Sequence, residues 1–596
     1  MRLGPGRLWV RWFQNDRFMK KGPIPLVFGI TGHRDLRKQD LPDLHRIIGT
    51  IFAEFEATYV NSPLVLLSSL AEGADRLAAQ IALEHGIDLI VPLPMELDDY
   101  RTDFETPESK DEFDNLLKQA KSVFVAPGVP GMGPADPAEE KTRSWSYARM
   151  GRYILHHCHI LIALWDGDHA EKTGGTSQIV RQKLEGLSFT HPSDWAILDL
   201  PEAGTVFHIV TPRESNPSPL GALELRKLYA DVSESEDGKK PQPEALFRSL
   251  LARADAFNFD ALHLREKHED QFQTSLSYLQ PDRELGALDP GFQKLLEQFA
   301  IADALAISFR RKRHLYLMIL CALVVPVSFF LAAYHSAGGA LRLEAIVCLA
   351  FFWISVLLAM AAYRKAQWRR FETKHLDYRA LAEGFRVLFF WRLAGIPDDI
   401  GAQYLRKHWS EVDWIRLAIR TCDPAPFSRT DTLSVEKYVL KHWMIDQREF
   451  FRTAGPLNYR LEHKNKDWAQ GLLAGGLIVA ALMYIIPLAY YLAEPTTPGW
   501  LSDLLHWLSL LVVVLLASAG AVAVFAEKLA YAQLSKQYGL MFRLFETATE
   551  KYEKCLDPPN LEKGQAILWR LGHEALRENG DWVLLHRERP MEMKIG

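Results

Sequence analysis

The stretch "PLVFGITGHRDL" (residues 25–36) decides the fold of the first third of the chain. A short apolar run, Leu26 to Phe28, ends at two glycines, Gly29 and Gly32. A strand that is apolar throughout, without alternation, is typical of a parallel sheet buried on both faces. Glycines after such a strand permit a tight turn and let backbone N–H groups approach an anion. We therefore expect a buried strand that leads into an anion-binding turn.

Similar apolar runs alternate with helical patterns as far as residue 212. This alternation predicts an α/β fold, a doubly wound, Rossmann-like parallel sheet with helices on both faces. Ligands of such sheets bind outside the carboxyl ends of the strands, at the topological switch point. The expected strands are Leu26–Ile30, Leu64–Ser69, Asp88–Leu93, Ser122–Ala126, His159–Trp165 and Thr205–Val210.

Three strand-to-helix junctions carry the residues that we expect to bind a ligand. The first offers a guanidinium that can pair with phosphate, and the second and third open helices whose N-terminal N–H groups favour an anion. A plain turn or a surface arginine would explain any one junction, but three junctions on one sheet edge predict a phosphate-bearing ligand. The candidates are Gly29, Thr31, Gly32, His33 and Arg34, then Ser69, Glu72, Gly73 and Arg76, then Asp166, Gly174, Gly175, Thr176 and Gln178.

Two further motifs invite a metal interpretation. The run "HHCH" (156–159) places four consecutive side chains in different directions, and metal sites need converging ligands. The aspartates of "WDGD" (165–168) are typical of a glycine-flanked turn. We therefore expect neither a metal nor a tightly bound cofactor, and only a nucleotide or NAD-derived ligand.

The overall composition excludes some classes of protein. The formal net charge is -5, and 24% of the residues are charged. This balance is not basic enough for a nucleic-acid binder, so no nucleic acid is expected as a partner. The five cysteines form no CxxC pair, which indicates reduced thiols in a protein that faces the cytosol.

Four segments lack Asp, Glu, Lys and Arg and are long enough to cross about 30 Å of hydrocarbon as helices. Basic residues flank their outer ends, whereas the two short hairpin loops hold only Arg342 among basic residues. By the positive-inside rule, both termini are cytoplasmic in a multi-pass protein of the inner (cytoplasmic) membrane. The segments are Leu315–Tyr334, Ala345–Tyr363, Trp468–Leu492 and Leu504–Ala526.

The membrane half looks duplicated. Each pair of segments starts with a proline-bearing helix (Pro326, Pro487), turns, returns and continues into a charged helix. Small residues, such as Gly471 and Gly475, allow helices to pack closely. No Asp, Glu, Lys or Arg lies inside the spans, so a pore formed here would be gated hydrophobically or be poorly selective, and built by several chains as a homo-oligomer.

These observations divide the chain into six parts. Residues 1–23 are expected to be a basic tail, residues 24–212 the nucleotide-binding domain and residues 213–291 a linker or connector. Residues 292–400 and 461–596 are each expected to hold a two-helix transmembrane module with cytosolic helices. Residues 401–460 are expected to form a cytosolic helical segment.

Two known families resemble this chain. The motifs "GITGHRDL", "SSLAEGADRLAA", "LIVPLPM" and "LIALWDG…GGTSQIV" resemble the SLOG superfamily of Rossmann-like domains, over about residues 24–212. That superfamily includes nucleotide-sensing domains, the DNA-processing protein DprA and the lonely-guy phosphoribohydrolases. The segments "DYRALAEGFRVLFFWRLAGI" and "LGHEALRENGDWVLLHRERP" resemble SLATT domains, membrane effector modules of bacterial conflict systems, over about residues 290–596.

The resemblance implies a membrane effector in bacterial defence. A cytosolic domain would sense a nucleotide-derived ligand, and the membrane helices would form or open a pore. The alternative is a membrane-tethered nucleotide N-glycosidase, because the phosphoribohydrolases carry an acid/base glutamate after their glycine-rich loop. Here Gln178 lies near that position, and an amide cannot transfer the proton, although Glu72 or Asp166 could substitute. Sensing is therefore favoured over hydrolysis.

Overall fold

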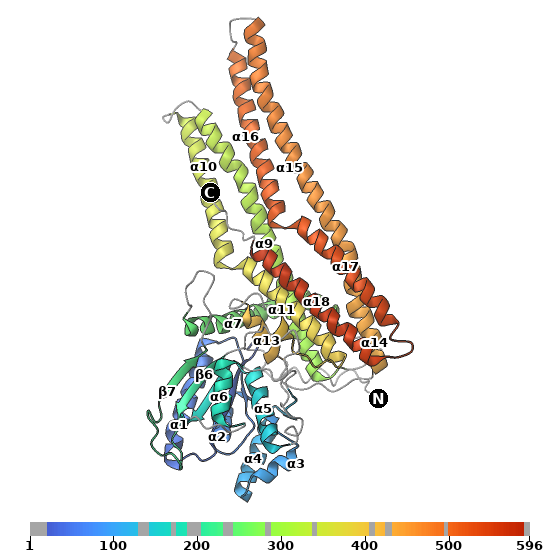
Figure 1. Cartoon of the computed structure of the whole chain (residues 1–596). Coiled ribbons are helices and arrows are strands. Elements are labelled where there is room, and N and C mark those ends of the chain that lie inside the picture. Colours follow the sequence, from blue (N-terminus) through green and yellow to red (C-terminus); the bar gives the residue numbers. More distant parts are fainter. Residues whose placement is uncertain are drawn as a thin grey trace, which may run out of the picture. The chain divides into compact units, whose positions relative to one another are not determined.

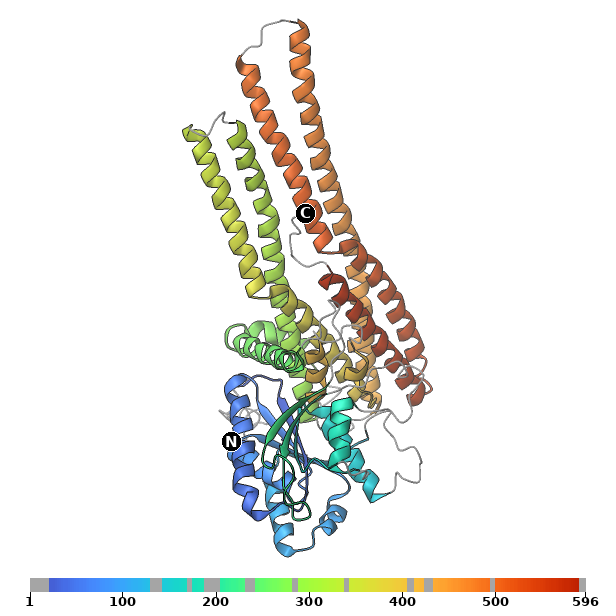
Figure 2. The same cartoon turned by 60° about the vertical axis from the view of Figure 1, so that its left-hand side comes forward.

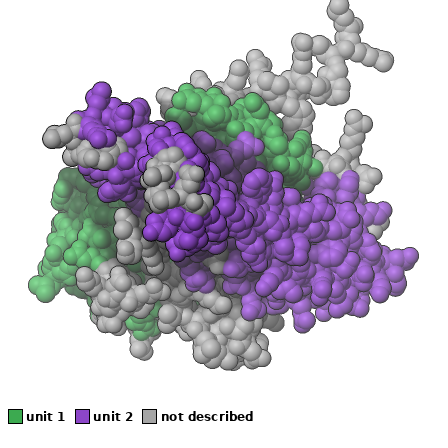
Figure 3. Space-filling model, turned by 90° about the horizontal axis from the view of Figure 1, so that it is seen from above, with its two compact units in different colours: residues 1–280, 286–301, 384–430 green, residues 281–285, 302–383, 431–596 purple. Residues whose placement is uncertain are grey.

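The structure, a computed structural model, divides the chain into two compact units (Figure 3). Unit 1 comprises residues 1–280, 286–301 and 384–430, and unit 2 comprises residues 281–285, 302–383 and 431–596. Helices α9 and α11 each contribute residues to both units. The described residues are 21–128, 142–168, 174–186, 204–230, 242–280, 288–336, 342–404, 412–422, 432–493 and 499–588, so most of the expected basic tail lies outside them.

Unit 1 is built on a seven-stranded sheet in the order β4-β3-β2-β1-β5-β6-β7 (Figure 1). Six strands run parallel, as predicted, and β7 pairs antiparallel with β6 at the edge. The short, half-polar "LRKLY" of β7 lacks the apolar run that identified the other strands. The strands are β1 Leu26–Gly32, β2 Leu64–Leu67, β3 Asp88–Leu93, β4 Ser122–Val125, β5 Ile160–Trp165, β6 Thr205–Val210 and β7 Leu225–Tyr229.

Helices cover both faces of the sheet, because alternate residues of β1 point into two separate cores. Leu26, Phe28 and Ile30 pack with α1, α2 and α4 on one face. Val27 packs with α5 and α6 on the other. The helices between β1 and β6 are η2 Lys38–Asp40, α1 Leu41–Thr58, α2 Ala74–Glu84, α3 Leu97–Tyr100, η3 Arg101–Asp103, α4 Pro107–Gln119, α5 Arg143–His157 and α6 Thr176–Glu185.

Most of the expected connector at 213–291 belongs to unit 1. It contains β7 and two helices, α7 (Pro243–Lys267) and α8 (Glu269–Ser277). Asn258 of α7, which is fully buried, accepts from the Ile24 N–H at 2.9 Å and donates to the Ile24 carbonyl at 2.8 Å. These bonds hold α7 beside the start of β1. The polar stretch 231–241, which suggested a linker, lies outside the described residues.

The second half of the chain is helical, as predicted. Among the described residues, four helices are long and apolar enough to cross a membrane. They form two hairpins, α9 with α10 and α15 with α16 (Figure 2). The helices are α9 Pro290–Ser336, α10 Leu343–Trp368, α11 Phe371–Leu393, α12 Ile400–Gln403, α13 Asp413–Thr421, α14 Thr432–Val439, the π-helical turn Leu440–Ile445, α15 Asp446–Ala493, α16 Gly499–Lys528, α17 Tyr531–Glu553 and α18 Leu561–Arg587.

The two hairpins are followed by the same break. Two residues separate α10 from α11 and α16 from α17, and the second of each pair is a non-glycine residue with positive φ, Arg370 (50°) and Ala530 (54°). Each break leads into a helix of 23 residues. This correspondence supports the duplication that the sequence suggested.

A buried arginine links the two hairpins where their apolar segments begin and end. Arg313 of α9 is 4% exposed. Its Nε lies 3.0 Å from Glu372 Oε1 of α11, and its Nη2 donates to the carbonyl of Lys528, the last residue of α16, at 3.3 Å. A cation at a helix C-terminus satisfies unpaired carbonyls and interacts favourably with the helix dipole.

Candidate functional site

The three predicted junctions lie together at the carboxyl edge of the sheet, because β2, β1 and β5 are neighbours. His33, directly after β1, joins the other two. Its N–H donates to the Leu164 carbonyl of β5 at 3.1 Å, and its carbonyl accepts from the Ala74 N–H, the first residue of α2, at 3.1 Å. The topological switch point therefore lies between β1 and β5.

Asp166, at the end of β5, is surrounded by partners from its own chain. Its Oδ1 lies 3.1 Å from His33 Nε2, and its Oδ2 accepts from Arg213 Nε at 2.8 Å and Asn216 Nδ2 at 3.2 Å. Burial opposes ionisation of this carboxyl group, but the hydrogen bonds from the Asp168 N–H, His33 and Asn216 outweigh it and lower its pKa. Asp166 is therefore an ionised anchor that orients His33.

Arg34 presents an exposed cation at the same edge. Its Nη2 donates to the Tyr147 hydroxyl at 3.0 Å, and its guanidinium carbon lies 5.4 Å from the centre of that ring. The hydroxyl in turn donates to Asp103. Burial and the bond to Asp103 raise the pKa of Tyr147 to about 12. The network holds Arg34 in place without enclosing it.

The second junction contains an internal anion. Asp75, in the first turn of α2, is 7% exposed, and its Oδ2 accepts from Ser69 Oγ at 2.7 Å. Burial raises its pKa to about 6, against the opposing effect of hydrogen bonds from Ser69 and from the backbone at Ala71. The predicted ligand residue Ser69 is therefore already bonded to Asp75.

The remaining candidates of this junction connect α2 to α4. Arg76 is 3% exposed and donates to the Leu70 carbonyl at 3.1 Å and to Glu112 at 2.8 Å. Glu72 accepts from the Ser109 hydroxyl. The structure thus gives Arg76 and Glu72 structural partners, and their contact with a ligand stays a prediction.

The third junction is held by a hydrogen bond within its own loop and packs against α5. The Gly174 N–H donates to Gln178 Oε1 at 2.8 Å. Gly174 has a φ of 75°, and a Cβ there would lie 3.3 Å from Tyr147 Cβ. The glycine loop therefore lies against the residue that holds Arg34, and Gly175 and Thr176 follow it at the start of α6.

The glycines of the first two junctions allow close packing. A Cβ on Gly29 would lie 2.5 Å from Ile154 Cγ2, and one on Gly32 would lie 2.4 Å from Ala74 Cβ. Gly73 has a φ of 77°, and its Cβ would lie 2.5 Å from the carbonyl oxygens of His33 and Arg34. Only glycine permits the loop after β1 to lie directly on the start of α2.

The helices at this edge begin without a side-chain cap. Gly73 precedes α2 and Gly175 precedes α6, and neither offers a side-chain acceptor. By contrast, α4 and α5 begin after Thr106 and Thr142, whose hydroxyls accept from the third helical N–H at 3.1 and 3.2 Å. Uncapped N-terminal N–H groups attract anions. One donor at α2, the Ala74 N–H, is already bonded to His33.

Several residues of the network were missed by sequence reasoning. Asp103 and Tyr147 lie between the expected strands. Arg213 and Asn216 lie in the expected connector. Aromatic and acidic residues inside helical patterns carry no signal of their own. The beginning of the 213–291 stretch, directly after the end of β6, was the available signal for Arg213 and Asn216.

Two histidines of the run "HHCH" have separate partners. His156 lies 3.2 Å from Asp399, and His159 Nδ1 accepts from the Val27 N–H at 3.0 Å. Burial lowers the pKa of His159 to about 3. Among the described residues, no three His, Cys, Asp or Glu side chains are grouped closely enough to hold a metal ion.

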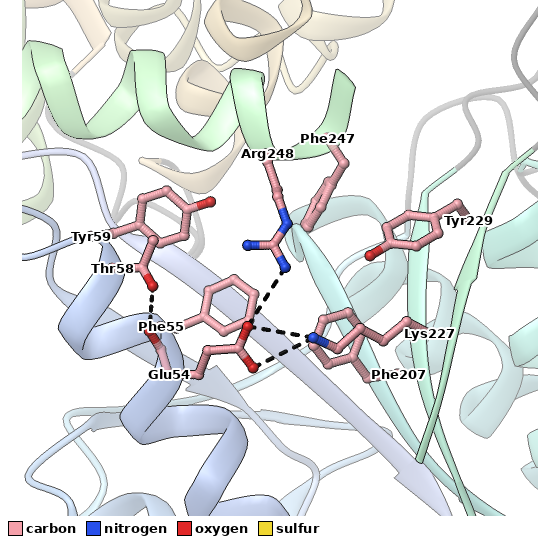
Figure 4. Close-up of a pocket in the computed structure, with 9 residues that line it drawn as sticks. All are labelled: Glu54, Phe55, Thr58, Tyr59, Phe207, Lys227, Tyr229, Phe247 and Arg248. Carbon is pink, nitrogen blue, oxygen red and sulfur yellow. Dashed lines mark hydrogen bonds and ion pairs between the residues drawn. The ribbon is translucent and has the colours of Figure 1, made fainter. Parts of the chain in front are cut away.

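A small cavity lies at the opposite, amino edge of the sheet (Figure 4). Its volume of about 10 Å³ suits a single water molecule. Glu54 lies 3.4 Å from Lys227 and 3.7 Å from Arg248, so the charged side chains that line the cavity pair with one another. This cavity is not a candidate ligand site. It is lined by Glu54, Phe55, Thr58, Tyr59, Phe207, Lys227, Tyr229, Phe247 and Arg248.

Comparison with known proteins gives one weak likeness. No family model and no curated protein matches the chain. A solved structure of DNA processing protein A (DprA) from Streptococcus pneumoniae is 21% identical, with a TM-score of 0.17. The likeness covers 26% of this chain and 45% of that one, so the chain spans less than half of DprA's length.

Proposed function

We propose that the chain is a ligand-controlled membrane effector of the kind that the SLOG and SLATT resemblances imply. The carboxyl edge of the sheet binds the phosphate of a nucleotide-derived small molecule, and binding changes the arrangement of the membrane helices. The resulting pore permeabilises the inner membrane of a bacterium, with the sheet in the cytosol. Several copies assemble around that pore.

The observation that supports ligand binding best is the uncapped start of α6 beside an exposed arginine. Gly175 leaves the first N–H groups of α6 without a side-chain acceptor, and the preceding glycine packs on Tyr147, which binds Arg34. Backbone N–H groups, the helix dipole and a guanidinium all favour an oxyanion. A terminal phosphate is the ligand group that fits this set.

The same contacts favour binding over bond cleavage. An acid/base carboxylate must reach the proton that it transfers. Asp166 is bonded to three side chains and Glu72 to Ser109, while Gln178 is a neutral amide that closes its own loop. We therefore favour a sensor over an N-glycosidase.

Strand β1 offers a route from the ligand to the membrane helices. Its carboxyl end carries His33 and Arg34, and the carbonyl of Pro23, before its amino end, accepts from Gln298 of α9 at 3.3 Å. Helix α9 then continues without interruption through the first apolar segment. A ligand acts along this route only if it binds two arrangements with different affinity.

The test compares Arg34→Ala with Arg46→Ala in purified protein reconstituted in liposomes. Arg46 is an exposed arginine on α1 that pairs with Asp43 at 3.1 Å and is not one of the candidate ligand residues, so its variant is a matched control. ADP-ribose, NAD, ADP and cyclic dinucleotides are offered as ligands. We expect binding of at least one of them, with dye release, in the unmodified protein and in Arg46→Ala.

Arg34→Ala should weaken that binding about tenfold or more, because a charged hydrogen bond contributes about 1.5–3 kcal/mol. It should abolish dye release at ligand concentrations that saturate the control. Equal affinities in the two variants would remove the proposed site. Release of free base from any of these compounds would favour the glycosidase instead.

A further inference from the structure

The two hairpins of unit 2 differ in the charge next to their apolar segments. Beside the first hairpin, residues 304–315 and 360–375 contain nine Lys and Arg but a single acid, Glu372. Beside the second, residues 456–470 and 524–533 contain four cations (Arg460, Lys464, Lys466 and Lys528) and three acids (Glu462, Asp467 and Glu527). Only the first hairpin has a strong excess of positive charge.

Six cations of the first hairpin form what we term the basic collar. All six side chains are exposed. In the part of the chain that the structure describes, none of the six is ion-paired with a carboxylate, whereas the buried Arg313 nearby is paired with Glu372. The collar consists of Arg310, Arg311, Arg364, Lys365, Arg369 and Arg370.

Ring contacts bring the parts of the collar together. The Phe371 ring lies 6.2 Å from that of Phe309 and 5.2 Å from that of Tyr316. Arg310 and Arg311 of α9 therefore lie next to Arg369 and Arg370, which directly precede Phe371. The cations come from the start of one span and the end of the next.

Markers of a membrane surface adjoin the collar. Leu315, directly after it on α9, is 49% exposed, and Leu357 and Leu358 on α10 are 59% and 55% exposed. Trp368 is 78% exposed and lies 4.8 Å from the guanidinium carbon of Arg369. Tryptophan is enriched at the level of lipid headgroups. Exposed apolar, aromatic and basic side chains thus adjoin one another here, as is typical of a bilayer surface.

We propose that the basic collar binds the headgroups of anionic phospholipids, and that the second hairpin does not. A juxtamembrane Lys or Arg contributes about 1 kcal/mol of attraction to an anionic leaflet, and clusters of four to eight such residues are typical of anionic-lipid recognition. The near-balanced charges beside the second hairpin give no comparable attraction. The proposal is independent of ligand sensing, since the collar lies entirely in unit 2.

The test measures lipid selectivity of the full chain in vesicles. Spin-labelled phosphatidylglycerol and phosphatidylcholine report the relative association of each lipid with the protein. A collar variant, Arg310→Gln, Arg311→Gln and Arg369→Gln, is compared with a control variant of equal size, Arg460→Gln, Lys464→Gln and Lys466→Gln. We expect preference for phosphatidylglycerol in the unmodified protein. The collar variant should lose this preference by about tenfold or more, because it lacks three cations that each contribute about 1 kcal/mol, and the control should change much less.

A charge-conserving variant, Arg310→Lys, Arg311→Lys and Arg369→Lys, guards against a loss caused by altered insertion. It should keep the preference, and salt should weaken the preference because screening acts on exposed charges. Equal losses in the collar and control variants would overturn the proposal. So would full preference in the glutamine collar variant, or removal of the preference by free ATP at low micromolar concentration, which would assign the cations to a soluble polyphosphate.

Discussion

Four helices of the sheet region in unit 1, α2, α4, α5 and α6, begin in two different ways. Helices α4 and α5 each begin after a threonine whose side chain caps a backbone N–H, whereas α2 and α6 begin after glycine. The capped helices follow strands on one side of the sheet, and the uncapped ones follow β2 and β5, the two neighbours of β1. A side-chain cap stabilises a helix, and its absence leaves donors for another acceptor.

The largest effect on ligand binding is expected when a negative charge is placed at the start of α6. Gly175→Asp supplies a cap and a negative charge where the proposed phosphate binds, and Gly175 has an extended backbone (φ −80°) that aspartate adopts without strain. We expect ligand affinity to fall about a hundredfold through charge repulsion, while stability is unchanged or rises by a few tenths of a kcal/mol. Calorimetric titration against Gly175→Ala, which adds no charge, checks this expectation, and similar affinities for both variants would contradict it.

The internal anion of α2 predicts a pH effect. Because burial raises the pKa of Asp75 to about 6, folded protein holds this proton more tightly than unfolded protein does. The contribution to stability is therefore present below pH 4 and is lost as the pH rises through about 6, by about 3 kcal/mol. Asp75→Asn should remove this pH dependence in thermal unfolding of unit 1. An unchanged profile would mean that Asp75 titrates normally.

At the capped helices α4 and α5, substitutions should change stability and leave ligand binding unchanged. Thr106→Ala and Thr142→Ala each remove the acceptor of one N-terminal N–H, at 3.1 and 3.2 Å. We expect each to lower stability by about 1 kcal/mol and to leave ligand affinity unchanged. Denaturation and binding measured on the same samples separate the two effects. Weakened binding in either variant would erase the distinction between the two kinds of helix start.

The smallest effect is expected at the tyrosine that holds Arg34. Tyr147→Phe keeps the ring beside the guanidinium but removes the hydroxyl between Arg34 and Asp103. The hydroxyl bonds Arg34 and not the proposed ligand, so ligand affinity should fall only about threefold, because Arg34 is held less firmly. Titrating ligand into the Tyr147→Phe and Arg34→Ala variants under the same conditions allows their losses of affinity to be compared. A loss as large as that of Arg34→Ala would make Tyr147 a direct ligand contact.

The sheet could be predicted from the sequence because its central strands are buried on both faces. β1, β3 and β6 consist of apolar runs, and the predicted strand bounds agree with the structure within two residues. The edge strand β7 and helices α7 and α8 were missed. Half-buried elements mix polar and apolar residues, and the Pro- and Ser-containing stretches around them are typical of linkers.

The candidate site was predictable only as a location. Glycine-rich junctions after parallel strands indicate which edge to examine, and the structure brings the three junctions together. The partners that already occupy these residues could not be predicted. The side-chain partners of Asp166 and Arg76 lie 33 to 50 positions away, apart from His33, which lies farther still. Such contacts depend on tertiary packing, which local spacing does not encode.

Arg313 has a consequence for how the spans could move. One guanidinium joins the start of the first span to the last turn of the fourth and to the helix that follows the second. Removing a partner from a buried ion pair is strongly destabilising, so this joint resists separation. If the proposed pore forms, the four spans should move about this point together, so that single pores should open and close in one step.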